Sequence, residues 1–287
     1  MKKTNYINEI TIIMVSYKSY KNIKNFLRNK PKKMKVIIIE NSNDDKIYKL
    51  KRKNIKIFKQ PNNGISSSIN YACKKVKTKY FFNFSPDIII KKESIKKIYT
   101  HGKNLKDNFG AIGPRFINVN PKSHKQSNMS IKLNKISAIH GSAMFVKLKN
   151  YYKIGKFDEN LFLFFEENDF CKRANNKKLY NYQANDVKVK NSKKGSINYK
   201  NIKEKNNIEN LYAWHFVWSK FYFTKKYYGF TISIFYFIPV ILRITLRIII
   251  HSIINIKKKD KYLIRLNGLV SSILGKKSYL RPKDIIL

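Results

Sequence analysis

Near the start of the chain lies the stretch Ile10-Thr11-Ile12-Ile13-Met14-Val15-Ser16-Tyr17. Its first six residues are apolar or β-branched, which is typical of a strand buried on both faces. Similar runs follow at residues 36–39, 55–58 and 80–84, separated by helix-forming segments at residues 19–29 and 66–76. This β-α-β alternation predicts an α/β domain with a largely parallel sheet.

In sheets of this kind, ligands bind at the carboxyl ends of the strands. Three polar clusters follow the expected strands there, namely Ser16-Tyr17, Glu40-Asn41 and Asp87. Further along, residues 110–116 and 143–146 are expected to form strands, with a loop between them. We therefore look for a ligand site among the polar clusters at the strand ends.

The composition changes in the last third of the chain. From Ile208 onward, apolar and aromatic side chains recur at helical spacing, which favours an amphipathic helix packed on the domain over a ligand site. Residues 230–256 are then almost uncharged. We expect a domain over residues 1–228 and a membrane-associating helical region over residues 229–287.

The first basic residue of the apolar segment is Arg243, so the uncharged part before it is shorter than the roughly 20 residues that span a bilayer. Arg243 and Arg247 share one helical face, and residues 257–261 add a basic flank. These features favour a helix that lies in the membrane surface with its arginines at lipid phosphates. A buried helix of a soluble protein and a transmembrane span are the alternatives.

The chain has 61 Lys and Arg against 17 Asp and Glu, a formal net charge of +44. Such a charge suits nucleic acid, an anionic membrane surface or a phosphorylated substrate. The excess is mostly Lys spread along the chain, together with abundant Asn and Ile, as an A/T-biased coding sequence produces. We therefore expect that nucleic acid is not the main partner.

Two cysteines, Cys73 and Cys171, exclude a disulfide scaffold and suit a reducing compartment. The basic start Met1-Lys2-Lys3 resembles that of a signal peptide, but the apolar run after Glu9 is too short for one, so we expect a chain that is not exported. The sequence has no zinc-spaced Cys and His, no phosphate-binding G-x-x-x-x-G-K-[ST] or G-x-G-x-x-G loop, and no G-x-S-x-G.

Asp87 follows a hydrophobic strand and the dipeptide Ser85-Pro86. A lone carboxylate in such a place can bind Mg²⁺ together with the phosphates of a substrate. Alternatively, Asp87 caps the helix expected over residues 93–99. The residues themselves leave both interpretations open.

Glu166, Glu167 and Asp169 form the densest acidic cluster in a chain with few acids. Carboxylates this close repel one another unless a cation or a helix end compensates, and one of them is a candidate general base. Alternatively, the three acids begin a helix that has Lys172 and Arg173 at its other end. The helix dipole favours acidic residues at the amino end and basic residues at the carboxyl end, so it would explain both groups.

In order along the chain, these pieces resemble the family 2 glycosyltransferases, particularly the rhamnosyltransferase-like branch, from about residue 11 to residue 229. The most specific segment, GKFDENLFLFFEENDFCKR from Gly155 to Arg173, resembles the family signature G-x-F-D-E-x-F-F…E-D-x-D-L-x-x-R. Shorter matches are Ile39-Glu40-Asn41-Ser42, Asn62-Asn63-Gly64 with Asn70, Phe84-Ser85-Pro86-Asp87, residues 110–115 and residues 140–144.

The resemblance implies a GT-A fold. It also implies inverting, non-processive transfer of a hexose, with rhamnose expected first, from a nucleoside-diphosphate sugar to a hydroxyl of a glycan or lipid-linked acceptor. Glu167 would be the catalytic base, and Asp87 and Asn191 would hold Mg²⁺ or Mn²⁺. The enzyme would be cytoplasmic, attached to the inner face of the plasma membrane. The residues expected to bind substrate are Val15, Ser16, Tyr17, Glu40, Asn41, Asn62, Gly64, Asn70, Gly141, Glu166 and Asp169.

The sequence departs from the family pattern at four positions. Glu40 and Glu167 each replace an Asp, Ser85 replaces an Asn, and Asn191 stands where the family often has a metal-binding His. An Asn oxygen can still bind a hard cation. The alternatives are a transferase for a galactofuranosyl or N-acetylhexosaminyl donor, a basic nucleic-acid-binding protein, and a membrane-bound pseudoenzyme.

Overall fold

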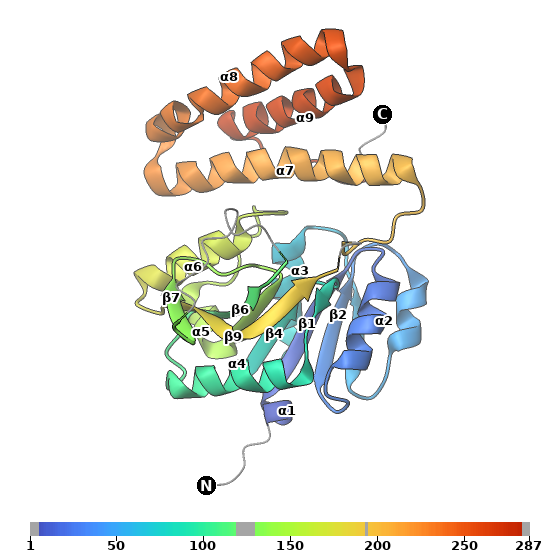
Figure 1. The fold of residues 1–287 in the computed structure, drawn as a ribbon, viewed down its shortest axis with the longest axis vertical. Helices are drawn as coiled ribbons and strands as arrows, with labels where there is room; N and C mark the ends of the chain where they lie inside the picture. The colour runs from blue at the N-terminus through green and yellow to red at the C-terminus, as the bar shows by residue number, and fades with distance from the viewer. Residues whose placement is uncertain (1–5, 119–129, 193–194, 283–287) are drawn as a thin grey trace. The chain divides into compact units, whose positions relative to one another are not determined.

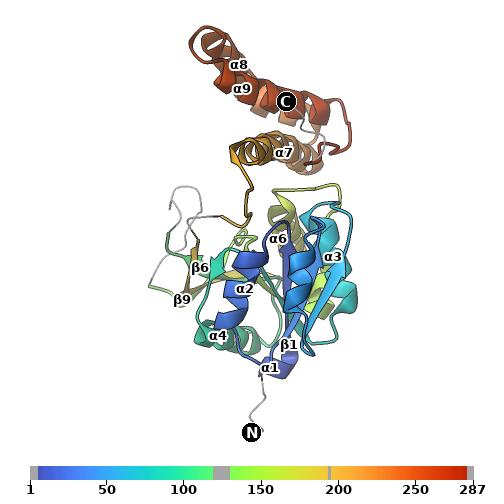
Figure 2. The same ribbon diagram turned by 90° about the vertical axis from the view of Figure 1, so that its right-hand side faces the viewer.

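A computed structural model describes residues 6–118, 130–192 and 195–282, and the chain forms two compact units (Figures 1 and 2). The sheet unit comprises Met1–Asp158 and Glu167–Asn198, and the helical unit comprises Glu159–Glu166 and Tyr199–Leu287. The chain therefore leaves the sheet unit after Asp158, returns at Glu167, and leaves it again after Asn198.

Four parallel strands form one half of the sheet. Their order is β3-β2-β1-β4, with β1 (Ile10–Ser16), β2 (Lys35–Glu40), β3 (Ile55–Lys59) and β4 (Tyr80–Phe84) all running in one direction. Along β1, alternate side chains enter the two cores, since Ile12 belongs to one cluster and Ile13 to the other, and both are fully buried. The predicted α/β domain with a mainly parallel sheet is confirmed.

The other half of the sheet is mixed. β8 (Ala143–Lys147) runs antiparallel to β4 and to β6 (Ile112–Phe116), and β6 is parallel to β9 (Asn181–Asn191). Two short strands, β5 (Ile88–Ile89) and β7 (Leu133–Ile136), pair antiparallel with β9. This pairing with β9 connects the region after β4 to the far end of the sheet unit.

Helices cover both faces of the sheet (Figure 2). One core includes residues of α2 (Tyr20–Asn29) and α4 (Lys92–Asn104), and the 3₁₀ helix η1 (Asp45–Leu50) lies on the same side. The other core is formed with α3 (Ile65–Lys75), α5 (Leu148–Ile154) and α6 (Glu166–Asn176). A four-residue helix, α1 (Tyr6–Glu9), precedes β1.

Two strands lie where the sequence pattern did not indicate them. β7 falls in the segment expected as a loop, which is a correction to that prediction; residues 119–129 of the segment lie outside the described part. β9 carries buried Asn181 and Asn185, whose amides donate to the carbonyls of Cys171 and Ile131 at 2.9 and 2.8 Å. Because polar side chains occupy buried positions of β9, the strand lacks a readable hydrophobic alternation.

The helical unit is built from α7 (Ile202–Tyr228), α8 (Phe230–Ile254) and α9 (Ile256–Ile273). Val217 and Phe221 of α7 pack with Phe237 of α8 and Leu269 of α9 in one cluster. The sequence placed a boundary after residue 228. In the structure the helix before that residue shares a core with the two after it, so the compact unit includes α7.

One face of α8 is apolar and exposed. Its side chains recur at helical spacing, and Ile253 is 88% exposed. Within the described residues, α8 is the one helix that is long and apolar enough to cross a membrane. The other residues of this face with more than half of their surface exposed are Ile232, Phe235, Tyr236, Leu242, Leu246, Ile249 and Ile254.

His215 of α7 is fully buried and connects three parts of the helical unit. Its Nε2–H donates to the carbonyl of Leu280 at 2.9 Å, so Nδ1 accepts from the hydroxyl of Ser278 at 3.1 Å. Its ring stacks on Phe162 with centroids 4.6 Å apart. Burial lowers the pKa of His215 to about 4, which keeps the ring neutral near pH 7.

This buried ring is expected to make the helical unit less stable in acid. As the pH falls from about 6.5 toward 4, His215 takes up a proton in the unfolded chain but not in the folded one, so the free energy of unfolding decreases. The full effect is on the order of 3 kcal/mol. Urea unfolding of the wild type and of His215→Gln at pH 7 and pH 4.5 measures it. The wild type should lose more stability than the variant, and equal losses would contradict the assignment.

Candidate active site

Two buried polar side chains lie together at the carboxyl ends of β1 and β2. Ser16 and Glu40 are register partners in the parallel pair, so their side chains point to the same face. Both are at most 1% exposed. Within the described residues, Ser16 Oγ and Glu40 Oε2 have no hydrogen-bond partner. Such orphaned atoms are costly, which marks this edge as unusual.

The other oxygen of Glu40 organises the loop that covers it. Glu40 Oε1 accepts from the backbone N–H of Ser42 at 2.6 Å and of Asp44 at 3.4 Å, and from the Ser42 hydroxyl. Ser42 Oγ in turn accepts from the N–H of Lys18 at 2.8 Å. The second oxygen of Glu40 is buried, whereas Val15 and Tyr17 are partly exposed at this edge.

The loop before α3 is tied to the end of β2 by Asn41. Its amide donates to the carbonyls of Gln60 and Pro61, both at 3.1 Å, and its Oδ1 accepts from Ser68 Oγ at 2.9 Å. Asn62 Oδ1 accepts from the N–H of Gly64 at 3.4 Å. Gly64 begins α3 with a φ of 96°, a left-handed conformation that glycine adopts without strain. Asn41 therefore shapes the loop that carries Asn62 and Gly64.

Asp87 and Asn191 lie side by side although they are far apart in the sequence. Ile88 is the register partner of Asn191, and the backbone N–H of Ser192 donates to the carbonyl of Asp87 at 2.8 Å. Asn191 Oδ1 is buried and has no partner among the described residues. Burial raises the pKa of Asp87 above its ordinary value. The predicted pair of oxygen groups is thus brought together by the pairing of β5 with β9.

Asp87 does not cap the following helix. α4 begins at Lys92, its N-cap residue is Lys91, and no side chain caps it. Asp87 instead lies in the turn after β4, in which the N–H of Ile88 donates to the carbonyl of Ser85 at 3.2 Å. The alternative interpretation of Asp87 is therefore wrong.

Gly141 lies next to the Asp87 turn. Its carbonyl accepts from the amide of Asn83 on β4 at 3.1 Å, and the carbonyl of Ser142 accepts from the N–H of Ser85 at 2.8 Å. These two bonds join residues 141–142 to the turn that carries Asp87.

The three acids at the start of α6 differ in accessibility. Glu166 is 8% exposed and Asp169 is fully buried, whereas Glu167 is partly exposed. The predicted helix start is also confirmed, since α6 begins at Glu166. Of the three carboxylates, that of Glu167 is therefore the one most accessible to a substrate, and the positive end of the helix dipole stabilises its charge.

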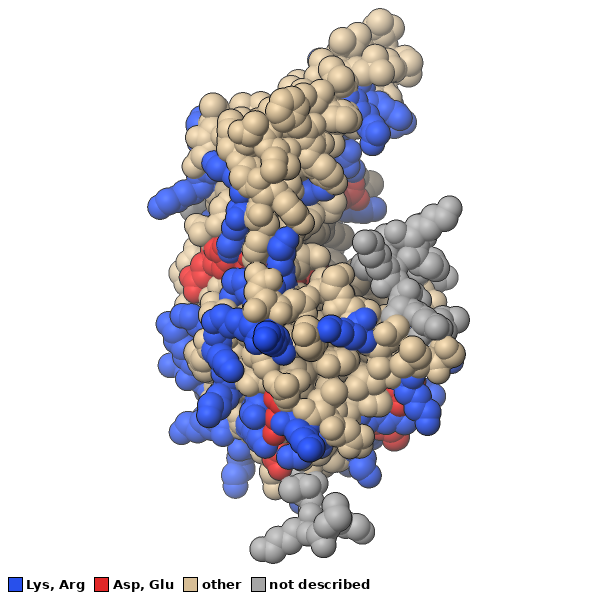
Figure 3. All heavy atoms as spheres, turned by 90° about the vertical axis from the view of Figure 1, so that its left-hand side faces the viewer, with Lys and Arg blue, Asp and Glu red and all other residues tan. Residues whose placement is uncertain are grey.

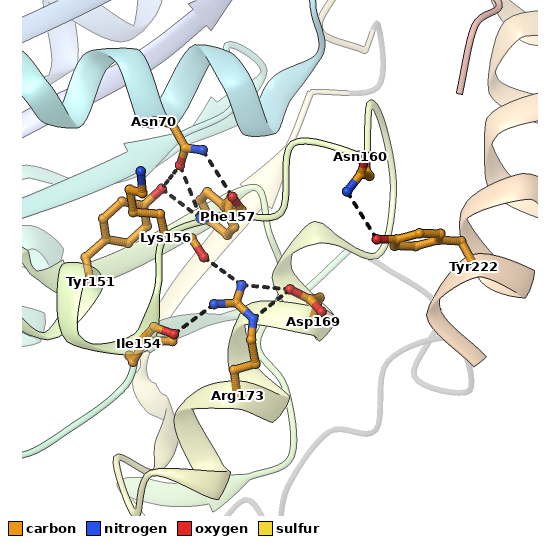
Figure 4. Close-up of polar contacts among 9 residues, drawn as sticks. All are labelled: Asn70, Tyr151, Ile154, Lys156, Phe157, Asn160, Asp169, Arg173 and Tyr222. Atoms are coloured by element: carbon orange, nitrogen blue, oxygen red, sulfur yellow. Dashed lines mark hydrogen bonds and ion pairs between the residues drawn. The ribbon is translucent and has the colours of Figure 1, made fainter. Parts of the chain in front are cut away.

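Asp169 has its partner inside the protein (Figure 4). Its Oδ2 accepts from Nε and Nη2 of Arg173 at 2.9 and 2.7 Å. Arg173 also donates to the carbonyls of Ile154 and Lys156 at 2.9 and 2.6 Å. The ion pair therefore fixes α6 against the end of α5, and this is the role the geometry gives to Asp169.

Asn70 of α3 is likewise used inside the protein (Figure 4). Its Oδ1 accepts from the hydroxyl of Tyr151 and from the N–H of Phe157 at 3.2 Å, and its amide donates to the carbonyl of Phe157 at 3.1 Å. Asn70 is 3% exposed. It connects α3 to the segment that leads toward the acidic cluster.

The segment after β9 returns to the end of β1, which the sequence did not indicate. The amide of Asn22 donates to the carbonyls of Gly195 and Ser196 at 2.9 and 3.0 Å, and the N–H of Asn198 donates to the carbonyl of Lys18 at 3.0 Å. No local pattern signals contacts between residues so far apart in the chain.

Comparisons with known proteins show the family of the chain. The family model described as Glycosyl transferase family 2 matches residues 11–177, more than half of the chain. The low-salt glycan biosynthesis hexosyltransferase Agl10 of Haloferax volcanii is 24% identical over an alignment of 192 residues that covers 58% of this chain and 62% of that protein. The chain thus spans less than two thirds of the length of this curated relative.

Two solved structures are similar as well. The crystal structure of GalNAc-T7 with UDP, GalNAc and Mn²⁺ has a TM-score of 0.54 at 9% identity, over 66% of this chain and 44% of that one. The structure of S. aureus TarS residues 1–349 has a TM-score of 0.48 at 14% identity, over 92% of this chain and 81% of that one. The family match establishes that the chain belongs to glycosyl transferase family 2, and together with the similarity to GalNAc-T7 it shows the GT-A fold.

Proposed function

We propose that this family 2 glycosyltransferase moves a hexose, with rhamnose as the first candidate, from a nucleoside-diphosphate sugar to a hydroxyl of a glycan or lipid-linked acceptor. The observation that carries the proposal is the contact between the Asp87 turn and Asn191 at the edge of the sheet where α/β proteins bind ligands. The name of the relative Agl10, a hexosyltransferase of glycan biosynthesis, supports the choice of a hexose.

The nucleoside of the donor is assigned to the ends of β1 and β2. Val15 and Tyr17 flank the site, and the unpartnered oxygen of Glu40 can accept a hydrogen bond from an N–H of the base once residues 42–44 make room. The loop of Asn62 and Gly64 leads into the amino end of α3, where the helix dipole favours an anionic group such as a phosphate.

Asp87 and Asn191 fit a divalent cation. A carboxylate and an amide oxygen are both ligands that Mg²⁺ and Mn²⁺ accept, and the diphosphate of the donor would supply others. A bound cation would also compensate the buried charge of Asp87. When bound, it supplies positive charge that stabilises the diphosphate as it departs. Residues 141–142 would keep the Asp87 turn in place.

Glu167 is assigned as the base because it is the accessible acid of its cluster. Its carboxylate takes the proton of the acceptor hydroxyl while the hydroxyl oxygen forms a bond to the anomeric carbon. The bond between that carbon and the diphosphate oxygen breaks on the opposite face, so the configuration inverts. Glu166 remains a candidate for holding a sugar hydroxyl, and one sugar is added per binding event.

Thermal unfolding of the purified chain with a panel of nucleoside diphosphates, with and without Mn²⁺, tests this proposal. A ligand that binds the native state raises stability by RT ln(1 + [L]/Kd). We expect stabilisation by one nucleotide that requires Mn²⁺ and is lost in Asp87→Asn, while the control Asp45→Asn, outside the site, keeps it. Stabilisation by a short oligonucleotide alone would instead favour the nucleic-acid-binding alternative.

We also propose that the helical unit attaches the enzyme to the inner face of the plasma membrane. In the view of Figure 3, Lys and Arg side chains are scattered over the surface. Few of them lie on the helical unit, which shows a broad uncharged surface in this view. The exposed side chains of α8 account for an apolar face, and Arg243 and Arg247 lie on its flank. This arrangement suits a helix in the membrane plane with arginines at lipid phosphates.

Charges on the outer face of α8 are expected to release the protein from membranes. In the double variant Leu242→Asp/Ile249→Asp, two side chains that are 65% and 59% exposed become anionic, which opposes both apolar insertion and attraction to anionic lipid. Co-sedimentation with vesicles containing anionic lipid should fall at least tenfold. Ile202→Asp, which is 76% exposed on α7, is the control. Undiminished binding of the double variant would rule out α8 as the attachment face.

A further inference from the structure

The segment before the acidic cluster contains a strained turn. Phe164 and Phe165 both have a φ of 67°, and they are followed directly by Glu166 and Glu167. In the left-handed region a residue with a side chain is strained, and a bulky residue there is a genuine outlier. Two such residues in succession persist only where their surroundings hold them in place.

The side chains that hold this turn come from α7. The Phe164 ring contacts Tyr212 and Phe216, with centroids 5.8 and 5.6 Å apart. The Phe165 ring contacts Phe216 and Phe223 at 5.8 and 5.5 Å. Phe216 therefore touches both strained residues.

Polar and buried contacts hold the residues just before the turn. The hydroxyl of Ser219 on α7 donates to the carbonyl of Leu163 at 2.7 Å. Phe162 lies between the ring of His215 and the guanidinium of Arg281, which is 4.2 Å from the ring centroid. Leu161 is fully buried in a cluster with Trp214 and Trp218. The whole segment from residue 161 to 165 is thus attached to α7 and to the end of the chain.

We propose that α7 is a positioning element for the catalytic base, acting through the Phe164-Phe165 turn. The inference rests on the proposed role of Glu167. The segment that contacts α7 ends at Glu166, the first residue of α6, and Glu167 is the next residue, so the turn is joined directly to the proposed base. A base displaced by about 1 Å loses a large part of its rate advantage. Phe216 is the positioning residue with the most direct effect.

The first test compares Phe216→Ala with Tyr228→Ala in the full-length protein. Both rings lie on α7 and are about half exposed, at 48% and 52%, but Tyr228 lies about 18 Å further along the helix axis. In Phe216→Ala, we expect the amide hydrogens of residues 160–170 to exchange at least tenfold faster than in the wild type. We also expect kcat to fall at least tenfold. The donor KM should stay within twofold, Phe216→Tyr should restore kcat, and the control should match the wild type.

Unchanged hydrogen exchange in Phe216→Ala would overturn the inference, and so would faster exchange with an unchanged kcat. Failure of the proposed function is distinguishable from both. If the wild type transfers no sugar from any donor, the assignment of Glu167 falls, while the exchange rates still show whether α7 holds the segment.

The second test separates the effect of the backbone conformation at Phe165 from the effect of its aromatic ring. Phe165→Gly and Phe165→Ala remove the same aromatic contacts, but only glycine adopts a φ of 67° without strain. We expect kcat of the Gly variant to exceed that of the Ala variant at least threefold, with equal donor KM. Equal kcat values in the two variants would show that the backbone conformation of the turn does not position the base.

Discussion

Glu167→Gln is expected to lower the rate of sugar transfer by at least about a thousandfold, because the amide cannot take the proton of the acceptor hydroxyl. Gln has almost the same shape as Glu, so donor affinity should stay within about twofold. The measurement is steady-state transfer at saturating donor and acceptor, together with nucleotide-dependent thermal stabilisation of the same samples. The second measurement shows that the variant is folded and still binds donor.

Two controls make this result interpretable. Glu209→Gln neutralises a partly exposed acid on α7 that pairs with Lys205 and Lys261, and it should leave transfer unchanged. Glu167→Asp introduces the residue that the family pattern has at this position and should retain far more activity than the Gln variant. Full activity in Glu167→Gln would mean that another group is the base.

Asp169→Ala is expected to lower the free energy of unfolding by about 3 kcal/mol, because it leaves the guanidinium of Arg173 without its anionic partner in a largely buried place. The carboxylate is fully buried and Arg173 has 21% of its side chain exposed, so the ion pair is poorly screened. Urea unfolding monitored by fluorescence measures the change.

The double variant Asp169→Leu/Arg173→Met removes both charges and should recover part of the lost stability, since no unpaired charge remains. Lys172→Ala, at the neighbouring position on α6, should change stability little. If Asp169→Ala were as stable as the wild type but bound acceptor poorly, the result would instead support the role predicted from the sequence, which is contact with substrate.

The parallel half of the fold was predictable because its signals are local. The apolar runs of β1, β2 and β4 are short and continuous, and the residues after them are polar, so the edge that carries Ser16, Glu40 and Asp87 could be located before the structure was known. The pairing of Asp87 with Asn191 was expected only through the family resemblance. Spacing alone could not have predicted that two residues so far apart in the chain lie side by side.

Roles were harder to predict than positions. Asn70 and Asp169 match family motifs, yet in the structure their polar atoms bind Phe157, Tyr151 and Arg173. A motif records which residue types stand in a place and not which neighbours satisfy their hydrogen bonds. The strained Phe164-Phe165 turn gave no signal, because its cause lies in a helix about 50 residues further along the sequence.

The discontinuous division of the chain has a consequence for its synthesis. Residues 159–166 leave the ribosome well before α7 and Arg281, which contact them, so the nascent sheet unit can form its strands while this segment still lacks these partners. The position that we propose for Glu167 as the base would then be reached only after the carboxyl-terminal helices have been made.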